Sequence, residues 1–189
     1  MNQEHYKVVM ESLWVLAEKG LSHLRVDCIS NRSGVAESAI EELFPHQHNI
    51  LLAMIENLKL LVELPAVDPR LTPRDQIFDA VMLYFDVVQP HRLAIKRLVE
   101  EIMWHPLLLK NIMPELYSIG ATIIDKYYPS TGMLQIGQNL AFNGAMAYAL
   151  KEFIDDDTFD LSKTMAALDQ GLKTVDDLTT RCQGLFNFK

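Results

Sequence analysis

The 189-residue sequence is long enough for one or two small domains with a buried core. Its hydrophobic content of 49%, charged content of 22% and formal net charge of −8 are typical of a soluble globular protein. No apolar run is long enough to span a membrane, the first residues do not resemble a signal peptide, and Cys28 and Cys182 fit no disulfide motif. We therefore expect a protein of the reducing cytoplasm.

Apolar residues recur at spacings of three and four along the chain, and strand-like alternation is absent, so we expect an all-α protein. The first four helices are predicted at 3–19, 26–33, 36–43 and 46–64. Gly20 ends the first of these helices, and Ser33–Gly34–Val35 forms a tight turn after the second. This order predicts a helix-turn-helix in which 36–43 lies in the major groove of DNA.

Pro65 and Pro69 interrupt the chain and mark the predicted domain junction. Further helices are predicted at 73–89, 91–104, 114–128, 131–154 and 161–178, with a short turn at 107–112. The predicted organisation is a helix-turn-helix domain (1–45), a connecting helix (46–64) and a ligand-binding and dimerisation domain (65–189).

Small residues recur at every fourth position of the predicted helix 131–154: Gly137, Ala141, Ala145 and Ala149. The last predicted helix carries an apolar stripe that includes Met165, Leu168 and Leu172. Small side chains let a neighbouring helix approach closely, so we interpret both stripes as the four-helix interface of a homodimer. The alternative is that both stripes serve the core of one chain.

Residues 9–52 follow a known pattern at their structural positions. The first helix ends at Gly20, Ile29–Ser30 stands in an Ile-Ala position, and Gly34–Val35–Ala36 stands in a Gly-Val-Ser position. Ile40–Glu41 and Phe44–Pro45–His46–Gln47 stand where the pattern has Leu-Tyr and Phe-x-x-Lys. The stretch resembles the TetR family of bacterial transcriptional regulators, which implies a TetR-like fold.

The residues that contact phosphate in that family, a Tyr and a Lys, are replaced here by Glu41 and Gln47. Residues 1–60 hold five Lys and Arg against eight Asp and Glu, a net charge of −3, and DNA affinity depends largely on cations. The helix that reads DNA either keeps sparse contacts or no longer binds DNA. The candidate contacts to double-stranded DNA are Arg25, Arg32, Ser38, Glu41, His46 and Gln47.

Two later segments, 74–98 and 154–172, resemble a subgroup near the TetR-fold lipid-binding accessory proteins of ubiquinone biosynthesis. That resemblance implies an isoprenoid lipid in the C-terminal domain and loss of DNA binding. Large apolar side chains and an amide are candidates to line a pocket for a small apolar ligand: Tyr84, Val88, Met103, Trp104, Tyr117, Phe142, Asn143 and Met146. The alternative is that these side chains fill a core.

No glycine-rich phosphate loop or nucleophile elbow is present, so we expect neither an enzyme nor a cofactor. The six His residues are scattered, so we expect no metal site, and we interpret 155–157 as a solvated acidic turn. Leu185, Phe186 and Phe188 are expected to dock on the body of the protein, with weak contact to a membrane surface as the alternative. The favoured function is a ligand-responsive transcriptional regulator, and the alternative is a lipid-binding accessory protein that does not bind DNA.

Overall fold

The computed structural model describes residues 3–186, except for the side chains of Leu178 and 181–186. In chain order these residues form α1 (Gln3–Ala17), η1 (Leu21–His23), α2 (Val26–Ser33), α3 (Glu37–Leu43), α4 (Gln47–Leu61), α5 (Pro73–Val88), η2 (Gln89–His91), α6 (Arg92–Ile102), α7 (Pro106–Tyr127), α8 (Gly132–Ile154) and α9 (Ser162–Phe186). The described residues contain no strand, so the expected all-α fold is confirmed.

The chain divides into two compact units that differ from the predicted domains. Unit 1 comprises Met1–Leu61 and Val87–Leu116, and unit 2 comprises Val62–Asp86 and Tyr117–Lys189. The sequence pattern had placed 87–116 in the ligand-binding domain. The difference arises because α6 packs against α1 and η1, which joins this segment to the helix-turn-helix.

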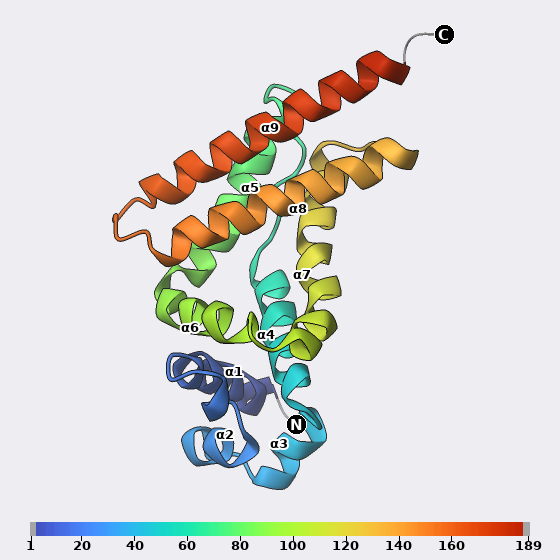
Figure 1. Ribbon diagram of the computed structural model, residues 1–189. Coiled ribbons are helices and arrows are strands. Elements are labelled where there is room, and N and C mark those ends of the chain that lie inside the picture. Colours follow the sequence, from blue (N-terminus) through green and yellow to red (C-terminus); the bar gives the residue numbers. More distant parts are fainter. Residues whose placement is uncertain (1–2, 187–189) are drawn as a thin grey trace. The chain divides into compact units, whose positions relative to one another are not determined.

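Unit 1 is built around the three N-terminal helices, in which α1 packs on α2 and α4, and α2 packs on α3 (Figure 1). Val9, Leu13, Ile29 and Ile40 are fully buried and form its centre. They fall on the inner faces of α1, α2 and α3 at helical spacing, so their burial fixes how the three helices pack.

Unit 2 is dominated by the contact between α8 and α9, which run side by side (Figure 1). The two helices approach closely at Gly171, where a Cβ atom would lie 2.7 Å from the Cβ of Ala145. Phe142 and Phe153 on α8 are fully buried, and the Phe153 ring lies 5.0 Å from the Phe85 ring of α5. Aromatic contacts of this kind stabilise a helical core beyond the apolar area that they bury.

The loop before α9 holds a buried carboxylate. Asp156 is fully buried and accepts hydrogen bonds from the backbone N–H and hydroxyl of Thr164, both at 2.8 Å, and from the N–H and hydroxyl of Thr158. Leu161 precedes α9 with a φ of 53°, and its side chain has no group that could cap the helix. Asp156 therefore caps α9 from five residues further back, so the prediction of a solvated turn is wrong for this residue.

Two predicted helix limits are also wrong. The proline pattern predicted a turn at 107–112 and a new helix at Pro114, whereas α7 runs through Pro114 to Tyr127. Pro114 is exposed, and Ile112 and Ile119 on either side of it are buried, so apolar burial offsets the lost backbone hydrogen bond. The last helix was expected to end at 178, but α9 continues to Phe186.

Among the described residues, no helix has both the length and the apolar character needed to cross a membrane.

Candidate nucleic-acid interface

The turn between α2 and α3 has the geometry that a helix-turn-helix needs. Gly34 ends α2 in the left-handed conformation with a φ of 71°, and its N–H donates to the carbonyl of Ser30 at 2.9 Å. Glycine adopts this conformation without steric cost, which allows the sharp change of direction. Buried Val35 and Ile40 then hold α3 against the core, while Ala36 at the N-cap offers no side-chain hydrogen bond. The frame is intact, although α3 lacks a capping side chain.

The solvent-facing side of α3 is acidic. Glu37, Ser38, Glu41 and Glu42 are all exposed, and α3 carries no Lys or Arg. Carboxylates on a helix that enters a DNA groove repel phosphate, and they can accept a hydrogen bond from cytosine only where neighbouring cations hold the backbone. The chemistry of this face opposes strong DNA binding.

The other candidate DNA contacts are dispersed around unit 1. Arg25 is paired with Asp27 at 3.3 Å, and Arg32 is exposed on α2. The exposed His46 ring stacks on His48 with a centroid distance of 5.4 Å. Gln47 donates its side-chain amide to the carbonyl of Leu21 at 2.8 Å. The residue in the family's lysine position is therefore engaged within the protein.

The sequence reasoning missed the residues that join α6 to the helix-turn-helix. The Glu101 carboxylate accepts a hydrogen bond from the N–H of Leu21 at 2.7 Å. Gly20 makes room for it with a φ of 102°, because a Cβ atom there would lie 2.3 Å from a Glu101 oxygen. The His91 ring stacks on Trp14 with a centroid distance of 4.6 Å, and partial burial lowers the pKa of His91. Gly20 was the only signal in the sequence, since nothing there marks Glu101, which lies 80 residues after the Leu21 N–H that it accepts from.

The eight candidate ligand-binding residues fall in both units. Val88 is buried in unit 1, where Met103 and Trp104 are 65% and 84% exposed. The others lie in unit 2: Phe142 is fully buried, Tyr117 is 37% exposed, and Tyr84, Asn143 and Met146 are half-buried. A common pocket for these eight residues stays a prediction.

Unit 2 also buries a short run of amide side chains on α8. Gln138 hydrogen-bonds to Ser130 and Thr179, and the Asn143 amide donates to the backbone carbonyl of Asn139 at 2.9 Å. Among the described residues, the buried Oδ1 atom of Asn139 has no hydrogen-bond partner. A buried acceptor of this kind needs a donor from water or a ligand.

The candidate dimer residues divide between the interior and the surface of one chain. Ala145, Ala149, Leu168 and Leu172 are buried in the chain, and Ala145 contacts Gly171 of its own α9. These four side chains therefore lie in the core of one chain, as the alternative interpretation of the two stripes had it. Gly137 is exposed, Ala141 is half-buried and Met165 is 39% exposed.

A different face of α8 is apolar and open to solvent. Four large side chains at helical spacing are exposed along it: Met133 at 82%, Ile136 at 67%, Leu140 at 69% and Tyr148 at 43%. A helix that is apolar on every side is normally buried on every side. These four side chains are among the large apolar groups that the described chain leaves exposed to solvent.

No group of three or more His, Cys, Asp or Glu side chains in the described residues could hold a metal ion. Asp157 pairs with Lys163 at 2.6 Å, and Asp156 faces inward. The side chains of Leu185 and Phe186, together with Phe188, lie outside the described residues, so their docking stays a prediction.

Comparisons with known proteins support the fold. No protein-family model matches the chain, and no curated protein matches it. The crystal structure of a TetR transcriptional regulator from Rhodococcus sp. RHA1 matches with a TM-score of 0.59 and 9% sequence identity, over 93% of this chain and 97% of that chain. The resemblance to lipid-binding accessory proteins of ubiquinone biosynthesis stays a prediction. Similarity at this level of identity establishes architecture, and the architecture of this chain is the all-α fold of a TetR regulator.

Proposed function

We propose that the protein is a ligand-responsive transcriptional regulator whose contacts with DNA are weakened. The observation that carries this proposal is the intact frame of α2, turn and α3, which presents α3 to solvent on a buried core. A frame of this kind places one helix in the major groove and positions it by contacts to the phosphate backbone. The acidic face of α3 reduces the affinity without altering the frame.

The contacts within unit 1 supply a way for a ligand to act on DNA binding. Glu101 and His91 hold η1 and α1 against α6 and the turn before it. A ligand that shifts α6 would move the helix-turn-helix with it, because these segments are joined by a hydrogen bond and a ring stack. Such a ligand acts by binding the two arrangements with different affinity.

The proposal includes a homodimer formed through the apolar stripe on α8. Large exposed apolar patches on soluble proteins usually mark interfaces, and the commonest oligomers are two-fold symmetric dimers. We expect Leu140→Glu, which puts a carboxylate in the centre of the stripe, to produce monomers in sedimentation velocity. Leu71→Glu is the matched control, because Leu71 is 47% exposed outside α8. A dimer that survives Leu140→Glu would place the interface elsewhere.

The DNA-binding proposal is tested by restoring the family's phosphate contacts. We expect the wild-type protein to bind its own upstream region weakly at physiological salt. The double variant Glu41→Tyr, Gln47→Lys should bind duplex DNA more tightly, with a salt dependence steeper by about one for each phosphate neutralised. The double variant Asp160→Asn, Gln170→Lys changes the net charge by the same +2 at exposed positions of unit 2 and is therefore the control for net charge.

Nanomolar binding of the wild-type protein to its upstream region, with a steep dependence on salt, would contradict the proposal that its DNA contacts are weakened. Failure of the double variant to bind would contradict the regulator proposal and favour the second candidate.

The second candidate is a lipid-binding accessory protein related to ubiquinone biosynthesis that does not bind DNA. The acidic α3 and the engaged Gln47 amide favour it, and the buried Asn139 acceptor is available to a donor group on a ligand. Native mass spectrometry of gently purified protein should then show a co-purified isoprenoid lipid. Added lipid should raise the melting temperature, because ligand binding to the native state alone stabilises it by RT ln(1 + [L]/Kd). A lipid-free mass and an unchanged melting temperature would count against this candidate.

A further inference from the structure

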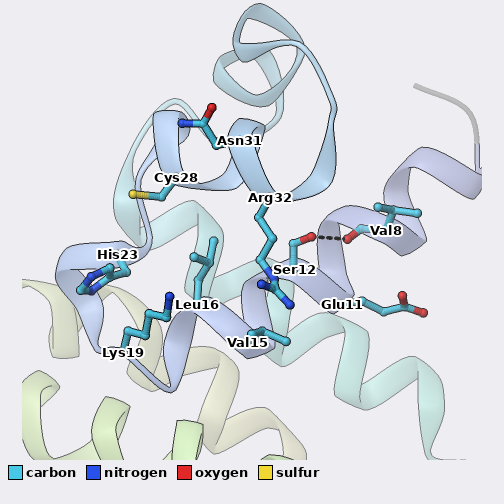
Figure 2. A pocket seen from close by; sticks show the side chains of 10 residues that line it. All are labelled: Val8, Glu11, Ser12, Val15, Leu16, Lys19, His23, Cys28, Asn31 and Arg32. Atoms are coloured by element: carbon cyan, nitrogen blue, oxygen red, sulfur yellow. Dashed lines mark hydrogen bonds between the residues drawn. The ribbon is translucent and has the colours of Figure 1, made fainter.

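A groove in unit 1 lies apart from α3, although Arg32, a candidate DNA contact, is among its lining residues. It has a volume of about 770 Å³ and is lined by one face of α1, by Lys19 in the turn after α1, by His23 of η1 and by one face of α2 (Figure 2). No residue of α3 lines it. The volume lies within the range of about 300–1,000 Å³ that is common for small-molecule sites.

The floor of the groove is apolar. Val8 is 42% exposed, Val15 is half-buried, and Leu16, which also lines the groove, is 6% exposed. The Ser12 hydroxyl turns back to donate its hydrogen to the Val8 carbonyl at 2.8 Å, as Figure 2 shows. The Ser12 hydroxyl is therefore not available as a donor to a ligand. The valine side chains on the α1 side of the groove can pack against a hydrocarbon chain.

The rim carries two cations that have no hydrogen bond or ion pair in the described part of the chain, Lys19 and Arg32. Most other described Lys and Arg side chains are paired, in a protein whose net charge is −8. Glu11 also lies on the rim, on α1, whereas Lys19 lies in the turn that follows α1. Figure 2 shows Lys19 and His23 at one end of the groove, Glu11 at the other, and Arg32 reaching from α2 between them. The end that holds Lys19 is therefore the cationic end.

We propose that this groove binds a small amphiphilic anion, with its carboxylate at Lys19 and its hydrocarbon chain along Val15 and Val8. The unpaired cation supplies the charge complement, and the apolar floor supplies the driving force for the chain. A nucleic-acid backbone would use the cations but not the floor. A neutral lipid would use the floor but leave the cations unpaired.

The test uses Cys28, which lines the cationic end and is half-buried, as a reporter of occupancy. In full-length Cys182→Ser protein, Cys28 is the only thiol, because the chain has two cysteines. The rate of its reaction with the uncharged reagent N-ethylmaleimide is followed by intact mass, with sodium decanoate as the probe. Decanoate at saturation should slow the reaction at least fivefold. Decanol, which lacks the charge, and acetate, which lacks the chain, should protect much less.

Two variants assign the interaction to the groove. Lys19→Glu should raise the decanoate concentration for half-protection about fivefold or more, since it reverses an exposed charge next to the carboxylate. Lys110→Glu is the matched control, because Lys110 is an exposed lysine of α7 that does not line the groove. Val15→Ser should weaken the binding of decanoate, because it removes apolar surface from the floor of the groove. It should leave the small protection of Cys28 by acetate unchanged. Far-ultraviolet circular dichroism confirms that each variant is folded.

Several results would overturn the proposal. Unchanged Cys28 reactivity in millimolar decanoate would show that the groove does not bind it. If decanol protected Cys28 as well as decanoate does, the charge of Lys19 would play no role in binding. If Lys110→Glu weakened decanoate binding as much as Lys19→Glu does, the effect of Lys19→Glu would come from net charge alone. Protection by duplex DNA in place of decanoate would reassign the groove to nucleic acid. None of these outcomes depends on whether α3 binds DNA, so this proposal and the regulator proposal can fail separately.

Discussion

Removing the buried carboxylate of Asp156 should destabilise the protein more than any other change to an acidic side chain in its loop. Asp156→Ala takes away the acceptor for two groups each of Thr158 and Thr164, and leaves the Thr164 N–H buried. A hydrogen bond to a charged group contributes about 1.5–3 kcal/mol, and an unsatisfied buried donor costs about 1–3 kcal/mol. Because the bonds share one carboxylate they do not add, and we expect a loss of about 3 kcal/mol at pH 7.

The contribution of Asp156 to the free energy of unfolding should also depend on pH. Burial opposes ionisation of Asp156, but the hydrogen bonds from Thr158 and Thr164 outweigh it and hold the pKa of Asp156 well below its usual range. The unfolded chain has the ordinary pKa of about 3.9, so the unfolded state takes up a proton first as the pH falls. The carboxylate therefore contributes its full stability above about pH 5 and loses it progressively at lower pH.

Urea unfolding followed by circular dichroism at pH 7, 4 and 3 measures both the loss of stability and its dependence on pH. Asp156→Asn keeps the shape and one acceptor oxygen but not the charge, so its deficit against wild type should shrink from pH 7 to pH 3. Asp157→Asn is the matched control: its side chain is 81% exposed, and the change should have little effect. A loss below about 1 kcal/mol for Asp156→Ala would refute the capping role. A deficit for Asp156→Asn that does not change with pH would refute the role of its charge.

Three other predictions address packing and titration elsewhere. Gly171→Ala should destabilise the fold by about 1–3 kcal/mol, since its Cβ meets that of Ala145, and Ala145→Gly in the same chain should recover part of the loss in urea unfolding. Gly20→Ala should lower the melting temperature, because the new Cβ collides with Glu101 at a positive φ; an unchanged melting temperature would show that Glu101 is free to move. Wild-type stability should fall as the pH drops below about 6.5, since burial lowers the pKa of His91 and the folded state disfavours its charge. His91→Phe should remove that part of the pH dependence.

Local signals in the sequence were enough to predict most of the helices and the helix-turn-helix. Gly34 needs a left-handed conformation, and the buried positions around it repeat at helical spacing, so neighbouring residues suffice to locate the turn. Pro114 misled the prediction, because a proline normally ends a helix unless buried side chains on both sides hold it in place. That compensation depends on tertiary packing, which the local pattern does not contain.

The site was harder to predict than the fold. The acidic character of α3 follows directly from Glu37, Glu41 and Glu42. The engagement of Gln47 with Leu21 and the bond from Leu21 to Glu101 join positions 26 and 80 residues apart, and such pairs leave no pattern in one sequence. Surface and core residues of a helical domain also share the same apolar types, so Trp104 was expected in a pocket although it is 84% exposed.

The discontinuity of unit 1 has a consequence for how the protein is made. The helix-turn-helix has been translated by Leu61, but its Leu21 N–H and its Trp14 ring receive their partners only when 91–101 have followed. At about 5–20 residues per second, ribosomes need roughly 2–8 s for these 40 residues. During that interval the nascent N-terminal helices expose a surface that α6 later covers, which makes it a candidate for chaperone capture. A fragment ending at Leu61 would keep that surface exposed permanently, so DNA-binding measurements on this protein call for the full-length chain.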